Sequence, residues 1–147
     1  MARLQLPAPS PILFETRLEV RIGDINYGGH LANDAVLGLA HEARVRFLKS
    51  LGYSEMDVEG LGIIMADAAI CYKNQAFHGD ALCVRVGLAD FNRYGCDILY
   101  QIVDDNGSKE VARLKTGVVF FDYTAQKVAR IPAAFAARFA DLTGELT

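Results

Sequence analysis

Polar side chains that could bind or activate a reactive group lie close together between residues 24 and 34. The six of them are Asp24, Asn26, Tyr27, His30, Asn33 and Asp34. Gly28 and Gly29 stand among them, and consecutive glycines allow positive φ angles that bring main-chain N–H groups close to a ligand. A helix that begins directly after such a turn directs its unpaired N–H groups, and the positive end of its dipole, toward whatever the turn holds. The segment therefore predicts a site that polarises an electrophilic group.

Two regular elements are expected to position this turn. Residues 14–22 alternate between apolar and charged or polar side chains, which is the period of two of a half-buried strand. After the turn, Asn33 or Asp34 is expected to cap the first turn of a long helix, and Gly52 follows in the usual position after a helix end. The apolar stripe of this helix consists of Val36, Ala40, Ala43, Phe47 and Leu51.

The rest of the chain returns to the period of two. Strands are predicted at residues 63–73, 82–88, 96–102 and 111–122, with a hairpin at residues 105–107 before the last. A turn at residues 124–127 and a short return follow, and Pro132 begins a predicted helix over residues 132–142. This order predicts one α+β domain over residues 1–147, in which an antiparallel sheet of about five strands wraps one long central helix. Residues 1–11 are expected to form a proline-rich N-terminal arm.

Composition and residue spacing argue against several classes of binding partner. A formal net charge of −3 without a long basic run argues against nucleic-acid binding. Neither a secretory signal nor an apolar run of about 18 residues stands out, so no membrane association is expected. The three histidines are scattered, and no metal site is expected. Cys71, Cys83 and Cys96 lie in apolar alternating runs without a CxxC motif, which indicates reduced packing residues of a cytoplasmic protein.

Several segments, in the same order and at similar spacing, resemble one known family. These are the strand end at residues 20–24, the turn at residues 29–33, Glu42-Ala43-Arg44 on the helix, and residues 72–76 followed by Gly79-Asp80. They are similar to the hotdog-fold acyl-CoA thioesterases of the 4-hydroxybenzoyl-CoA thioesterase type, over roughly residues 13–135. The resemblance implies a hotdog fold, hydrolysis of acyl-CoA thioesters, and no cofactor beyond the coenzyme A of the substrate. It also implies a homodimer or homotetramer with the site between subunits.

One position departs from the pattern of this family. The family has Asp, any residue and Asp before the glycine-rich turn, and the second carboxylate is the one generally assigned as catalytic. This chain has Asp24-Ile25-Asn26 instead. An amide cannot act as a general base or attack a thioester as a carboxylate does, but it can bond a carbonyl or orient water. Asn26 is therefore expected to position water or substrate.

Thioester hydrolysis requires donors for the developing oxyanion and a base for the attacking water. The helix start around His30 is expected to supply the donors, with His30 itself binding the thioester carbonyl or the substrate. The other oxygen-binding or substrate-binding candidates are Gly28, Gly29, Leu31 and Asn33. The choice of base stays open among three carboxylates, which are Asp24, Glu42 and Asp67.

Coenzyme A brings phosphates that require cations. Lys73 is available, and Arg93-Tyr94 falls where the resembled family places part of its nucleotide-contacting loop. Lys73, Arg93 and Tyr94 are therefore the candidate coenzyme A contacts. Two other functions stay open. One is an acyl-CoA or acyl-carrier binding protein that has lost hydrolysis through Asn26. The other is a hydratase of enoyl or hydroxyacyl thioesters, which is disfavoured because the turn has no second catalytic histidine.

Overall fold

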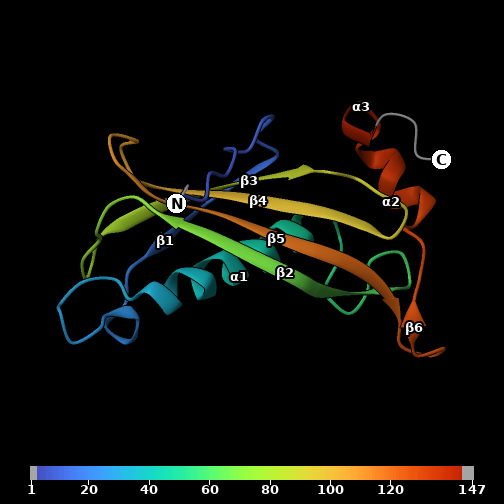
Figure 1. Cartoon of the computed structure of the whole chain (residues 1–147), viewed down its shortest axis with the longest axis horizontal. Coiled ribbons are helices and arrows are strands. Elements are labelled where there is room, and N and C mark those ends of the chain that lie inside the picture. The colour runs from blue at the N-terminus through green and yellow to red at the C-terminus, as the bar shows by residue number, and fades with distance from the viewer. Residues whose placement is uncertain (1–2, 144–147) are drawn as a thin grey trace.

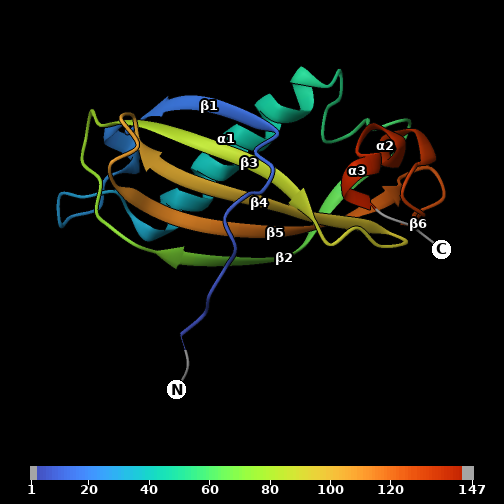
Figure 2. The same ribbon diagram turned by 90° about the horizontal axis from the view of Figure 1, so that it is seen from above.

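One antiparallel sheet dominates the computed structural model, which describes residues 3–143. Its five main strands follow the spatial order β1-β3-β4-β5-β2. Their bounds are β1 Phe14–Glu19, β2 Gly62–Tyr72, β3 Ala81–Ala89, β4 Gly95–Asp104 and β5 Glu110–Asp122. A two-residue strand, β6 (Lys127–Val128), pairs with the end of β5. Figure 2 shows β1 and β2 at the two edges of this sheet, and the prediction of about five antiparallel strands is confirmed.

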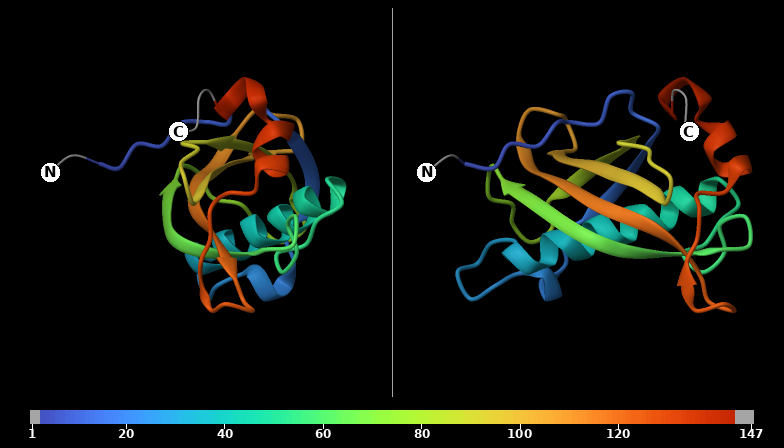
Figure 3. Two further views of the ribbon diagram at one scale, coloured as in Figure 1. Left: turned by 90° about the vertical axis from the view of Figure 1, so that its right-hand side faces the viewer. Right: turned by 45° about the vertical axis from the view of Figure 1, so that its right-hand side comes forward.

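The long helix α1, Asn33–Ser50, packs against one face of the sheet, as Figure 1 shows. Figure 3 shows the strands curving around this helix, so the predicted wrapping is confirmed. Four residues of the predicted apolar stripe are buried, and they meet inward-facing side chains of β3, β4 and β5 that are fully buried. These core residues are Val36, Ala40, Ala43, Phe47, Val84, Val86, Tyr100, Ile102 and Leu114. The fifth residue of the stripe, Leu51, follows the helix end and is partly buried. Gly52, with φ of 85°, follows the end of the helix as expected.

The structure corrects three local predictions. The first strand ends at Glu19, and a single 3-10 turn, η1 (Ile22–Asp24), leads into the polar segment. The N-cap of α1 is Ala32, which has no side-chain oxygen, so neither Asn33 nor Asp34 caps the helix. The predicted C-terminal helix is two pieces, α2 (Ala133–Arg138) and α3 (Ala140–Thr143). It breaks at Phe139, where the backbone leaves the helical region and the ring packs against Phe135.

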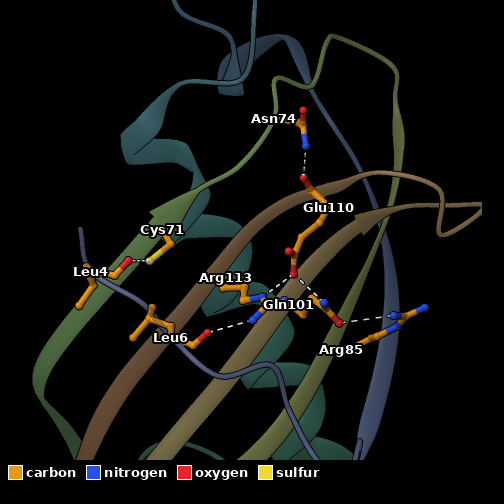
Figure 4. Close-up of polar contacts among 8 residues, drawn as sticks. All are labelled: Leu4, Leu6, Cys71, Asn74, Arg85, Gln101, Glu110 and Arg113. Atoms are coloured by element: carbon orange, nitrogen blue, oxygen red, sulfur yellow. Dashed lines mark hydrogen bonds and ion pairs between the residues drawn. The ribbon is translucent and has the colours of Figure 1, made fainter. Parts of the chain in front are cut away.

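The described part of the N-terminal arm, residues 3–11, lies on the outer face of the sheet, opposite α1; residues 1–2 lie outside the described residues. Figure 4 shows the Leu4 carbonyl accepting a hydrogen bond from the Cys71 thiol and the Leu6 carbonyl accepting one from Arg113. Arg113 and Gln101 both donate to Glu110 on the same face. The chain before β1 therefore crosses the sheet from Leu13, whose N–H donates to the Val86 carbonyl of β3, to the edge strand β2.

The cysteines have no disulfide partner in the described part of the chain. Cys96 is buried in the core, and burial raises the pKa of its thiol to about 12. Cys71 and Cys83 are partly exposed. No helix among residues 3–143 is long and apolar enough to cross a membrane, and no cluster of three metal-ligating side chains occurs in the same range.

Candidate active site

The polar segment before α1 folds into a closed loop held by Asn26. Its amide oxygen accepts a hydrogen bond from the Gly28 N–H (2.9 Å), and its carbonyl accepts one from the Gly29 N–H (3.0 Å). The Asn26 N–H donates to the His30 carbonyl at 3.1 Å, and Gly29 has φ of 83°, which a glycine adopts without strain. The side-chain NH₂ of Asn26 has no partner among the described residues. Asn26 therefore shapes the loop with its oxygens and keeps its amide donors available.

Gly28 and Gly29 use their main-chain N–H groups inside this loop. Leu31 likewise donates its N–H to the Ala76 carbonyl at 2.7 Å, which ties the loop to the segment after β2. The three amides expected to meet a substrate oxygen are thus engaged within the chain in this structure. The amides of Asn33 and Asp34, at the start of α1, have no hydrogen bond partner among residues 3–143. The available donors are therefore those of the first helical turn.

His30 lies beside Gly28 and Asn26. Its Nδ1 is 3.1 Å from the Leu31 carbonyl oxygen, which can only accept, so Nδ1 carries the proton. In the neutral ring Nε2 then has a free lone pair. A Cβ added to Gly28 would lie 3.5 Å from this Nε2 and 3.2 Å from the Asn26 amide oxygen. The absence of a side chain at position 28 therefore leaves room for the imidazole and the amide together.

Asp24 is buried and fixes the start of the loop. Its carboxylate accepts hydrogen bonds from the Arg21 backbone N–H (2.9 Å) and the Arg21 guanidinium, and its carbonyl accepts one from the Ala32 N–H. These contacts hold the strand end, the loop and the helix start in one arrangement.

Two pockets flank the first turn of α1, both between this helix and β2. The larger pocket, about 410 Å³, runs along α1 from Asp34 to Arg44 and along β2 over residues 65–68. The smaller pocket, about 250 Å³, is bounded by His30, Asn33, Tyr72 and Lys73. The Tyr72 hydroxyl donates to the Asn33 carbonyl at 3.1 Å, at the boundary of the smaller pocket. Asp34 has no ion-pair partner among the described residues, and the prediction of this residue as a helix cap missed its place in the larger pocket.

Glu42 lies outside both of these pockets. It forms an ion pair with Arg46 at 2.9 Å, and Arg46 also donates to Thr16 and to the Arg17 carbonyl. Its place on the helix is therefore next to β1, in the region of a different surface hollow lined by Arg17 and Glu19. The structure does not bring Glu42 together with Asn26 and His30.

Asp67 borders the larger pocket at a bulge in the edge strand β2. Its carboxylate accepts hydrogen bonds from Lys115 (3.0 Å) and the Gly117 N–H (2.9 Å), and the bond from Lys115 lowers its pKa. A Cβ at position 117 would lie 2.4 Å from its Oδ1, so glycine at this position makes room for the carboxylate. Asp67 thus lies at a sheet edge, where its carboxylate is paired with Lys115.

A polar network, buried at Arg44, Tyr100 and Thr116, forms the floor of the larger pocket, and none of these residues was predicted as a site residue. Arg44 donates from Nε to Glu55 (2.9 Å) and from a terminal nitrogen to the Tyr100 hydroxyl (3.1 Å). The Tyr100 hydroxyl lies 2.8 Å from Thr116 Oγ1, and His41 Nε2 lies 2.8 Å from the other oxygen of Glu55. Arg44 follows Ala40 and Ala43 on the buried face of the helix. A charged residue at such a position indicates a buried polar contact, and this was the sequence feature that could have predicted the network.

The candidate coenzyme A residues divide between the two ends of the sheet. Lys73 borders the smaller pocket, near the start of α1. Arg93 and Tyr94 lie before β4 at the opposite end, where the Arg93 carbonyl accepts from Ile131 and the Tyr94 carbonyl from Phe120. Within one chain the structure therefore does not bring these three residues together.

Comparison with known proteins identifies the class. Residues 20–139 match the family model of the thioesterase-like superfamily, so the chain belongs to that superfamily. It is a thioester hydrolase of the hotdog-fold type, as the sequence resemblance implied. Membership supports hydrolysis of acyl-CoA thioesters in general terms. No curated protein sequence is significantly similar to the chain.

Solved structures share the fold at low sequence identity. Slr0204, a 1,4-dihydroxy-2-naphthoyl-CoA thioesterase from Synechocystis, superposes with a TM-score of 0.77 at 22% identity, covering 90% of this chain and 98% of that one. YbaW, a probable thioesterase from Escherichia coli, gives 0.75 at 20% identity, with 88% and 98% covered. The gentisyl-coenzyme A thioesterase BH1999 gives 0.73 at 18% identity, with 83% and 98% covered.

Proposed function

We propose that this protein hydrolyses acyl-CoA thioesters at the start of α1, between the two pockets. The observation that carries the proposal is the pair of unengaged amides at Asn33 and Asp34, which lies between two hollows of about 250 and 410 Å³. N–H groups of a first helical turn point out of the helix start, and the dipole adds positive potential there. A thioester carbonyl bound to them would be polarised as its oxygen gains negative charge.

Asp34 is the carboxylate best situated to activate water in this proposal. Asp24, Glu42 and Asp67 are engaged by Arg21, Arg46 and Lys115, whereas Asp34 borders the larger pocket without such a partner among the described residues. The oxygen of water attacks the carbonyl carbon while its proton passes to Asp34. The carbon–sulfur bond then breaks, and the proton returns to the departing thiolate. The free amide donors of Asn26 and the Nε2 of His30 orient the water and the substrate.

Lys73 is proposed to meet the coenzyme A portion, since it borders the smaller pocket on the far side of the helix start. The larger pocket then receives the acyl group. Its apolar lining, which includes Leu37, Met65 and Ala68, suits a hydrocarbon portion.

A second copy of the chain is proposed to pair along β2. This strand is an 11-residue edge whose residues 65–68 are exposed, and open edges of this length are covered in most native proteins. Antiparallel pairing about a two-fold axis would bring Arg93 and Tyr94 of the partner subunit toward Lys73. This arrangement would unite the coenzyme A candidates that lie apart in one chain.

Substituting Ala68→Lys is expected to weaken this pairing, because a charge on an edge strand opposes strand addition. The variant should show a lower mass than wild type by light scattering at equal concentration. A wild-type protein that is monomeric at concentrations where it is fully active would contradict the shared site.

The proposed function is tested by free-thiol release from a panel of short, long and aromatic acyl-CoAs. An enzyme-only blank is required because Cys71 and Cys83 are partly exposed. Release that depends on Asp34 and His30 supports the proposal. Intact acyl-CoA recovered with the protein, without release, would favour the non-hydrolytic binding function that Asn26 suggested. In that case Asn26→Asp is the informative variant, because it restores the carboxylate of the family pattern.

A further inference from the structure

The floor of the larger pocket is built from polar groups that are almost completely buried. Thr116 is 1% exposed, Arg44 is 6% exposed and Tyr100 is inaccessible, yet Arg44 and Thr116 both line the pocket. Buried polar groups are costly unless each donor and acceptor is paired. The directions of the hydrogen bonds in this network therefore show which groups are left for a ligand.

The direction of each bond follows from Arg44, which can only donate. Its terminal nitrogen donates to the Tyr100 hydroxyl, so the Tyr100 oxygen is an acceptor in that contact. The hydroxyl hydrogen of Tyr100 then needs an acceptor, and among residues 3–143 that acceptor is Thr116 Oγ1, 2.8 Å from the Tyr100 oxygen. Tyr100 thus donates to Thr116, and the hydroxyl hydrogen of Thr116 is left without a partner in the described chain.

The pocket floor consequently offers donors and lacks an acceptor to match them. The Thr116 O–H and the second terminal nitrogen of Arg44 are both unengaged in the described structure. A ligand that fills the pocket completely needs an oxygen acceptor at this depth, because a plain hydrocarbon would leave both donors buried without partners.

The charged side chains around the pocket determine whether the oxygen acceptor of a ligand should be anionic or neutral. The charge of Arg44 is balanced by Glu55 at 2.9 Å, which also contacts His41. Asp34 and Asp67 contribute two carboxylates to the same pocket, and Lys115 pairs with the second of them. An anionic acceptor would meet these carboxylates, whereas a hydroxyl or keto oxygen carries no such penalty.

The polar floor lies well beyond the helix start. Arg44 follows Asp34 by ten positions, about 15 Å of helix, and its side chain leans back toward the helix N-terminus. A thioester carbonyl bound at Asn33 and Asp34 would therefore lie several bonds from the floor. We propose that the protein selects acyl groups that carry a neutral oxygen, as hydroxyl or keto, near the end distant from the thioester. This inference rests on the proposed function for the position of the carbonyl.

The test compares three acyl-CoAs of matched length, which are octanoyl, ω-hydroxyoctanoyl and octanedioyl. For the wild-type protein, kcat/KM is expected to be about tenfold or more higher for the hydroxyacyl than for the plain acyl substrate, with the dicarboxylic substrate poorest. Thr116→Val should bring the hydroxyacyl-to-acyl ratio toward one, and Thr116→Ser, which keeps the hydroxyl, should preserve it. A wild-type ratio near one, a preference for octanedioyl, or a ratio unchanged in Thr116→Val would overturn the inference.

Affinity measurements test the selection of acyl groups independently of the proposed hydrolysis. The same three acyl groups can be presented as thioether analogues that cannot be hydrolysed, with affinities measured by calorimetry. A preference for the hydroxyacyl analogue without turnover of any thioester would support the pocket assignment and refute the hydrolysis. Turnover of all three thioesters at equal rates, with equal affinities for the analogues, would refute the pocket assignment alone. If Thr116→Val does not fold, the wild-type ratios decide the question.

Discussion

Replacing Asp34 by Asn is expected to lower kcat for thioester hydrolysis by about 10²-fold or more. The substitution keeps the size and the polarity of the side chain but removes its ability to accept a proton. Asp34 has no capping role, since Ala32 is the N-cap, so the helix loses little from the change. The measurement is kcat and KM on whichever acyl-CoA the panel identifies, with a thermal unfolding curve to show that the fold is intact.

Glu42→Gln is the matched comparison for this experiment. It removes a carboxylate from the same helix, but one that lies against Arg46 and outside the two pockets. If Glu42→Gln abolishes turnover and Asp34→Asn does not, the base is Glu42, one of the three carboxylates predicted from the sequence, and the acyl group must approach the other side of α1. A parallel loss in His30→Gln with an increased KM would assign His30 to binding rather than to proton transfer.

The fold was predictable because hydrophobic periodicity is local. The alternation in residues 82–88 and 96–102, and the helical stripe from Val36 to Leu51, each report burial of one face without information about distant residues. The break at Phe139 was not predictable in this way. It arises because Phe139 and Phe135 pack into one aromatic cluster with Phe91, which belongs to another part of the chain.

The candidate site was predicted in part, for the same reason. Asn26 and His30 lie four positions apart, and their closed loop follows from the glycines between them. Arg44, Tyr100 and Thr116 meet only after a helix has packed on a sheet, because 56 positions separate the first two. Pairing of this kind has no local signature. Asp34 was misread because an aspartate at a helix start is more often a cap than a pocket residue.

Replacing Arg44 by Met is expected to destabilise the protein by about 3 to 5 kcal/mol. Methionine retains much of the length and the apolar contact, but it leaves Glu55 without its buried partner and Tyr100 without a donor. Because the Glu55 side chain is 28% exposed and can be hydrated, the loss should fall toward the lower end of this range. Chemical denaturation with a fitted m-value measures it, at fixed protein concentration because oligomerisation would contribute.

Arg46→Met provides the control for this prediction. Its ion pair with Glu42 is on the surface, with side chains 41% and 51% exposed, and exposed pairs contribute about 0 to 1 kcal/mol. Equal losses in Arg44→Met and Arg46→Met would show that the buried network contributes no more to stability than the surface contacts of Arg46.

Arg44→Met should also change how the free energy of unfolding depends on pH. Burial by itself would raise the pKa of Glu55, but hydrogen bonds from His41 and Arg44 outweigh burial and hold this pKa below its usual value of 4.5. The folded state therefore binds fewer protons at Glu55 than the unfolded state, and the resulting stabilisation is present above about pH 4.5 and lost as pH falls through the lowered pKa. Without Arg44, burial of Glu55 is opposed only by His41, so the pKa should rise. The difference in unfolding free energy between wild type and Arg44→Met is then expected to shrink as the pH falls below about 4.5, whereas a constant difference down to acid pH would mean that Arg44 does not act through Glu55.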